Sequence, residues 1–103
     1  MNRLYVIINT AGLTSAQQAV QAGHAVAKWL LAYPSPWQNE VLVYTQVNSE
    51  DKLLEYAGGL QAVGSAYVLY QDTDLGNFYT TLATTNGKAI KRLPLWSPCC
   101  KSC

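Results

Sequence analysis

The chain has 103 residues, of which 50% are hydrophobic and 13% are charged, against roughly a quarter charged in an average globular domain. This composition excludes intrinsic disorder, and the length suits one domain that buries most of its chain surface. Seven Lys and Arg against six Asp and Glu exclude strong long-range attraction to nucleic acid, although a local basic patch stays open. No apolar run reaches the roughly 20 residues of a membrane span, so we expect a soluble cytoplasmic protein without membrane contact.

Strands and helices are predicted to alternate along the chain. The apolar run Leu4–Ile8 is typical of a strand buried on both faces, and Thr14 or Ser15 caps a long helix that ends before Pro34. A second helix follows Asn48 or Ser49. Further strands are expected at 40–47, 66–70 and 79–83.

This order predicts an α/β fold of three layers, with a mixed four-stranded sheet between helices. Strand-helix-strand units favour right-handed crossovers and parallel strands, whereas the link before 79–83 is too short for a crossover and makes that strand antiparallel. We assign residues 1–96 to one domain and 97–103 to a tail. The tail holds all the cysteines of the chain, Cys99, Cys100 and Cys103, so none can cross-link the body of the fold.

The long helix carries a polar line on an otherwise apolar surface. Gln17, Gln21, His24 and Lys28 fall within about 60° of arc, and most of the other side chains are Ala, Val, Leu or Trp. A helix this apolar is expected to be largely covered. What its polar line faces should therefore decide the function.

Ligands of open α/β sheets bind beyond the carboxyl ends of the parallel strands, a rim that here comprises 10–15, 48–51 and 71–77. The first of these loops has only Gly12, and Asn86–Ala89 lacks the first glycine and the hydroxyl of a phosphate-binding loop, so specific nucleotide motifs are absent. Asp72 and Asp74 resemble the start of a calcium loop, but the twelfth position is Ala83. Asp72 then either forms an Asx turn or orients a water at the rim.

His24 is the only histidine, and two interpretations remain open. A lone histidine on an apolar helix is more often a packing residue than a catalytic one. No G-x-S-x-G elbow supports a serine triad, and the tail cysteines lack the paired C-x-x-C spacing of structural zinc sites, so no metal or cofactor is expected. The basic cluster Lys88, Lys91 and Arg92 is either a solvated face or a set of phosphate contacts.

Several segments together resemble the type 2 peptidyl-tRNA hydrolase family. They are the strand YVIINT, the helix motif QAGHA at 21–25, the acidic loop QDTDLGN at 71–77, the strand TTLA at 80–83 and the ending LPL at 93–95. The resemblance covers roughly Leu4 to Leu95 and is greatest to the short branch of phages and bacteria. It implies a mixed four-stranded sheet between helices and hydrolysis of the ester that joins a peptide to tRNA, without a cofactor.

The resemblance also implies roles for individual residues. Asp72 matches the acidic residue that activates or positions the water, His24 the histidine of the helix motif, and Thr80 a hydroxyl near the site. Substrate contacts are expected from Gln17, Gln21, Lys28, Lys88, Lys91 and Arg92.

Gln17 stands where the hydrolases of the family have a functional lysine. The alternative hypothesis is therefore a non-catalytic binding module on the same fold, which has lost activity because that lysine is replaced. The expected partner is tRNA or peptidyl-tRNA, and the patterns leave open whether the protein is a homodimer.

Overall fold

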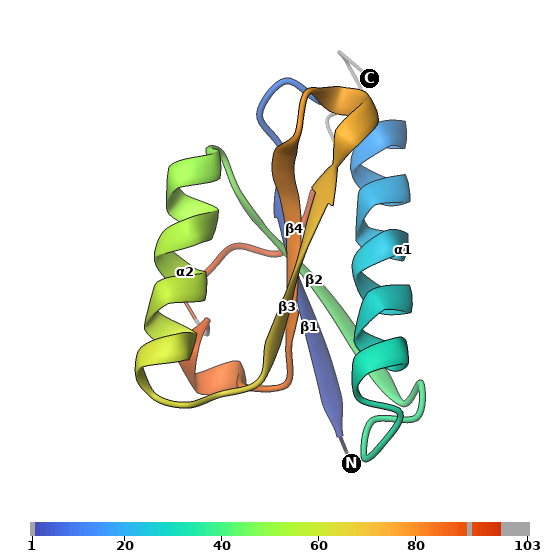
Figure 1. The fold of residues 1–103 in the computed structure, drawn as a ribbon, viewed down its shortest axis with the longest axis vertical. Helices are drawn as coiled ribbons and strands as arrows, with labels where there is room; N and C mark the ends of the chain where they lie inside the picture. Colours follow the sequence, from blue (N-terminus) through green and yellow to red (C-terminus); the bar gives the residue numbers. More distant parts are fainter. Residues whose placement is uncertain (1, 91, 98–103) are drawn as a thin grey trace.

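The computed structural model describes residues 2–90 and 92–97. Figure 1 shows three layers, with a sheet between helices α1 and α2, which confirms the predicted fold class. The strands are β1 (Arg3–Asn9), β2 (Val41–Val47), β3 (Tyr67–Asp72) and β4 (Phe78–Thr84). The helices are α1 (Ser15–Ala32) and α2 (Glu50–Ala62), with single 3₁₀ turns η1 (Thr73–Leu75) and η2 (Gly87–Ala89).

The sheet is mixed and has the strand order β2-β1-β4-β3. β1 and β2 are parallel, and β4 runs antiparallel to both β1 and β3. The carboxyl ends of β1, β2 and β3 therefore lie at the same end of the sheet, where β4 begins. That end also holds the start of α1, whereas η2 lies at the opposite end (Figure 1).

Two hydrophobic cores lie on the two faces of the sheet because the side chains of β1 alternate between them. Leu4, Val6 and Ile8 pack with Trp29 on the α1 side, whereas Ile7 packs on the α2 side, in a core that contains Leu53, Ala57, Leu60 and Leu82. Each fully buried aliphatic side chain contributes about 1.5–3 kcal/mol relative to exposure. The two-sided burial predicted for the first strand is confirmed.

Helix α1 begins with a capping box. The hydroxyl of Thr14 accepts a hydrogen bond from the backbone N–H of Gln17 at 3.1 Å, and the side-chain oxygen of Gln17 accepts one from the backbone N–H of Thr14 at 2.9 Å. This pairing satisfies two of the backbone donors that have no partner within the helix. The side chain of Gln17 is thus held at the helix start.

The prediction that α1 is largely covered is wrong. One side packs on the sheet, but the outer side leaves Leu31 87% and Val20 58% exposed. The polar line is split as well, since Gln21 is buried whereas Gln17, His24 and Lys28 are exposed. The misinterpretation arose because many apolar positions of the helix are alanine, and an exposed alanine adds little apolar surface.

The segment after η2 returns to β2 and extends the sheet. The backbone N–H of Gln46 donates to the carbonyl of Pro94 at 3.1 Å, and that of Trp96 donates to the carbonyl of Tyr44 at 2.9 Å. The indole N–H of Trp96 also donates to Gln18 on α1 at 2.7 Å. The chain is therefore fixed to the fold up to Trp96, and the three tail cysteines lie outside the described residues.

Within 2–90 and 92–97, no helix is both long and apolar enough to cross a membrane.

Candidate functional site

A pocket of about 410 Å³ lies where the three predicted rim loops meet, and we call it the rim pocket. Its walls come from the ends of β1 and β2, the start of α2, the η1 turn and the start of β4. The lining residues are Asn9, Ala11, Gly12, Leu13, Ser49, Glu50, Leu75, Phe78 and Thr80.

A chain of hydrogen bonds runs from the rim pocket to Asp72. The hydroxyl of Thr80 donates to the side-chain oxygen of Gln21 at 2.7 Å, and the side-chain nitrogen of Gln21 donates to Asp72 Oδ2 at 2.6 Å. Thr80 is 2% exposed and Gln21 is 3% exposed, so water competes little for these bonds. The backbone carbonyl of Gln21 accepts a further bond from Thr81 at 3.1 Å, which fixes α1 against β4.

The carboxylate of Asp72 is held in its charged form. The hydrogen bond from Gln21 lowers its pKa from the ordinary value of 3.8, partial desolvation opposes this, and backbone donors at Asp74 and Leu75 and the charge of His24 lower it further. Asp72 Oδ1 accepts the backbone N–H of Asp74 at 2.8 Å, so the Asx turn is also present. Lowering the pKa of a carboxylate makes it a weaker base, but the carboxylate still orients the donors around it.

The direction of this chain determines what Thr80 offers to a ligand. Because its proton points to Gln21, its oxygen presents only lone pairs to the pocket. It can therefore accept a hydrogen bond from a water or an N–H group. The side-chain nitrogen of Asn9 donates to the carbonyl of Tyr79 at 3.5 Å and keeps a second N–H for a ligand. The backbone N–H of Gly12 donates to no group in the described part of the chain.

Glu50 contributes a second carboxylate that our sequence interpretation did not single out. Its Oε2 accepts the backbone N–H of Tyr79 at 2.9 Å, which ties the first residue of α2 to β4. The signal was present, because Glu50 follows the cap Ser49 inside the rim loop 48–51. Among residues 2–90 and 92–97, no Lys, Arg or His lines the rim pocket, and Glu50 gives it a negative charge.

His24 and Lys28 lie beside β3 and outside the rim pocket. The ring of His24 stacks on Tyr70 with a centroid distance of 4.6 Å and an interplanar angle of 7°. The ammonium of Lys28 donates to the carbonyl of Leu69 at 2.5 Å. Both residues line a groove of about 440 Å³ with Gln71, the neighbour of Asp72. The sequence-predicted residues that the structure brings together are thus Gln21, Asp72 and Thr80.

Of the predicted basic cluster, Lys88 lies away from this chain of hydrogen bonds. Lys88 belongs to η2, which follows the end of β4 at the opposite end of the sheet from the rim (Figure 1). Arg92 is exposed on the segment that leads to Leu93, and Lys91 lies outside the described residues. The expected phosphate contacts of all three stay predictions.

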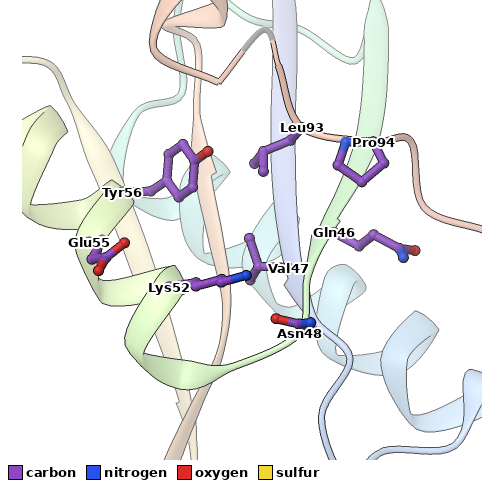
Figure 2. A pocket seen from close by; sticks show the side chains of 8 residues that line it. All are labelled: Gln46, Val47, Asn48, Lys52, Glu55, Tyr56, Leu93 and Pro94. Atoms are coloured by element: carbon purple, nitrogen blue, oxygen red, sulfur yellow. The ribbon is translucent and has the colours of Figure 1, made fainter.

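A second pocket, which we call the flank pocket, lies between α2, the end of β2 and the returning C-terminal segment. It has a volume of about 370 Å³ (Figure 2). Its lining residues are Gln46, Val47, Asn48, Lys52, Glu55, Tyr56, Leu93 and Pro94. Figure 2 shows the side chain of Lys52 extending toward Val47 and Asn48. The sequence interpretation missed Lys52, which has no basic neighbour in the sequence.

No group of three or more His, Cys, Asp or Glu side chains that could hold a metal ion occurs among residues 2–90 and 92–97. The zinc alternative for the cysteines concerns a tail outside these ranges.

Comparisons with known proteins find a similar fold but assign no function. No family model matches the chain, and no curated protein matches it. A solved structure of a protein of unknown function from Agrobacterium tumefaciens strain C58 is similar, with a TM-score of 0.71 and 11% sequence identity. The match covers 93% of this chain and 98% of that one, so the two share the whole fold.

Proposed function

We propose that this protein hydrolyses the ester bond that joins a peptide to the terminal ribose of tRNA. The observation that supports the proposal is the chain of hydrogen bonds from Thr80, which lines the rim pocket, through the buried Gln21 to the partly exposed Asp72. The resemblance to type 2 peptidyl-tRNA hydrolases implies roles for the same residues. A homodimer and a cytoplasmic location stay predictions.

In the proposed reaction the attacking water lies in the rim pocket and donates a hydrogen bond to Thr80. The water oxygen bonds to the carbonyl carbon, the bond from that carbon to the ribose oxygen breaks, and the proton that the water loses ends on the leaving ribose oxygen. Asp72 holds Gln21, and Gln21 holds the hydroxyl of Thr80, so the accepting lone pair has a fixed direction. The side-chain amide of Asn9 and the backbone N–H of Gly12 would donate hydrogen bonds to the negatively charged oxygen of the transition state, as in an oxyanion hole. Positioning is the main contribution, because an ester needs only an oriented water and a polarised carbonyl.

The test is the release of N-acetyl-phenylalanine from charged tRNA by the purified protein. Asp72→Asn keeps the shape of the side chain but removes the charge that orients Gln21, and we expect activity to fall by about 100-fold. Ser65→Ala is a control at the other end of the sheet and should not change the rate. A wild-type protein that releases nothing above the buffer rate would exclude the hydrolase.

The alternative, a binding module without activity, is favoured by one specific observation. The rim pocket has no cation among the described residues that could stabilise the negative charge of the transition state. The side chain of Gln17 is also held in the capping box at the start of α1. If the wild type is inert while Gln17→Lys hydrolyses the ester, the protein has kept the fold of a hydrolase and lost the reaction. We expect Gln17→Lys to gain no activity, because residue 17 does not line the rim pocket.

A further inference from the structure

Lys52 occupies a position where local helix chemistry disfavours a lysine. It is the third residue of α2, after the N-cap Ser49, and its backbone N–H donates to the Ser49 hydroxyl at 3.1 Å. A Gln or Glu there would complete a capping box, as Gln17 does in α1, and a cation in the first turn opposes the helix dipole. The stability of α2 therefore does not explain this lysine.

The polar side chains of the flank pocket are not used by the fold. The ammonium of Lys52, the hydroxyl of Tyr56 and the side-chain amide of Asn48 make no hydrogen bond with any described residue, and the Gln46 amide uses only its oxygen, for Ser97. One cation and three groups that can donate hydrogen bonds are thus available. In Figure 2 Glu55 lies one turn along α2, and Lys52 extends away from it.

One wall of the flank pocket is attached to the sheet by backbone hydrogen bonds. Leu93 and Pro94 form that wall, and the bond from Gln46 to Pro94 together with that from Trp96 to Tyr44 attaches them to β2. The pocket therefore does not require the C-terminal segment to order around a ligand, which reduces the entropy lost on binding.

The two pockets lie on either side of one turn. Val47 and Asn48 line the flank pocket, whereas the next two residues, Ser49 and Glu50, line the rim pocket. A phosphate in the rim pocket would meet the carboxylate of Glu50 and no cation. A phosphate in the flank pocket would meet Lys52 and neutral donors, and it would avoid the carboxylate of Glu55, which also lines the pocket, because Lys52 extends away from Glu55 (Figure 2).

We propose that the flank pocket binds a backbone phosphate of the nucleic acid whose terminal ester lies in the rim pocket. The inference rests on the proposed function for the identity of that nucleic acid, and it assigns the phosphate to Lys52, Asn48 and Tyr56. It replaces none of the groups that act on the ester.

The decisive variant is Lys52→Gln, because a structural and a ligand-binding role of Lys52 predict opposite results. Completing the capping box should leave the melting temperature unchanged or raise it, whereas removing the cation should weaken phosphate binding about tenfold. Arg3→Gln removes one positive charge at the opposite end of the sheet, where β1 begins, and is the matched control. It should change neither the melting temperature nor the affinity.

The probe is the 5′-phosphorylated trinucleotide CCA, and the comparison is adenosine, which has no phosphate. Each is titrated into the ¹⁵N-labelled protein at two salt concentrations. We expect the trinucleotide to bind more tightly than adenosine, to shift the amide signals of Asn48, Lys52 and Tyr56, and to lose affinity in Lys52→Gln. Equal binding of the trinucleotide and adenosine, or equal loss of affinity in Arg3→Gln and Lys52→Gln, would overturn the proposal.

Hydrolysis is measured separately, so that the two proposals fail separately. Phosphate binding that depends on Lys52 in a protein without ester hydrolysis would sustain the pocket and reject the enzyme. Ester hydrolysis whose KM is unaffected by Lys52→Gln would sustain the enzyme and reject the phosphate site.

Discussion

The rim pocket and the flank pocket share a turn of the chain but treat their polar groups in opposite ways. In the rim pocket Thr80 and Glu50 are bound to Gln21 and to the backbone of Tyr79. In the flank pocket Lys52, Tyr56 and Asn48 are bound to no described group. Fixed acceptors suit the orientation of a reacting water, whereas a free cation suits a charged group whose exact position matters less. We therefore infer that the rim pocket positions a water and that the flank pocket attracts a phosphate.

Gln21→Leu should have the largest effect on stability, because it removes the hydrogen bonds that hold Thr80 in the rim pocket. It leaves the buried hydroxyl of Thr80 without its short acceptor and Asp72 without its side-chain donor, so we expect a loss of about 2–3 kcal/mol in the free energy of unfolding. Urea unfolding measures it. In the double variant with Thr80→Val the loss should be smaller than the sum of the single losses by about 1 kcal/mol, because both polar partners are then removed. Simple additivity would show that the two groups do not act as a chain.

Trp96→Ala should come next and damage the flank pocket alone. The indole donates to Gln18 and packs edge-on against Tyr44 with a centroid distance of 5.9 Å, so its loss should lower the free energy of unfolding by about 2 kcal/mol. Binding of phosphorylated CCA should weaken as the wall of Leu93 and Pro94 loosens. Leu95→Ala, at a side chain that is 68% exposed, is the control and should stay within about 0.5 kcal/mol of wild type.

Gln17→Lys should have a smaller effect and sharpen the comparison of the two helix starts. It removes one bond of the capping box of α1 and places a cation at the positive end of the helix, so we expect a loss of about 0.5–1 kcal/mol. Lys52→Gln makes the reverse change in α2. Thermal unfolding measures the melting temperature of both variants. A decrease in both, or an increase in both, would contradict the proposed effect of the third residue on helix capping.

The acid titration of Asp72 should give the smallest change in stability. Since its pKa is lowered in the folded protein, chiefly by the bond from Gln21, its contribution is complete above the ordinary value of 3.8 and is lost as pH falls through the folded pKa. Carbon-detected NMR of the carboxyl group should show a pKa below 3.8 in wild type and a higher one in Gln21→Leu. An unchanged pKa in the variant would mean that Gln21 does not hold the carboxylate.

The sequence was sufficient for the order of the elements and for the end of the sheet at which the rim loops meet. Two-sided burial of β1 and the short link before β4 follow from local patterns, and both are present. The chain Thr80–Gln21–Asp72 could be predicted as a set of residues but not as a chain of bonds. It depends on the register of α1 against β4, over 59 residues of sequence separation.

Lys52 shows why the remainder could not be predicted. Its place in the flank pocket depends on the C-terminal segment opposite it, and that segment returns to β2 through backbone bonds at Gln46 and Tyr44. Such pairing leaves no periodic pattern in the sequence. The same holds for His24, whose place beside Tyr70 depends on which strand forms the edge of the sheet.

The division of labour between the pockets is tested most directly by steady-state hydrolysis of N-acetyl-phenylalanyl-tRNA with the Thr80→Val and Lys52→Gln variants. We expect Thr80→Val to lower kcat with little change in KM, and Lys52→Gln to raise KM about tenfold with kcat unchanged. If Thr80→Val keeps the wild-type kcat, or if Lys52→Gln lowers kcat without affecting KM, the assignment of chemistry to one pocket and phosphate binding to the other is wrong.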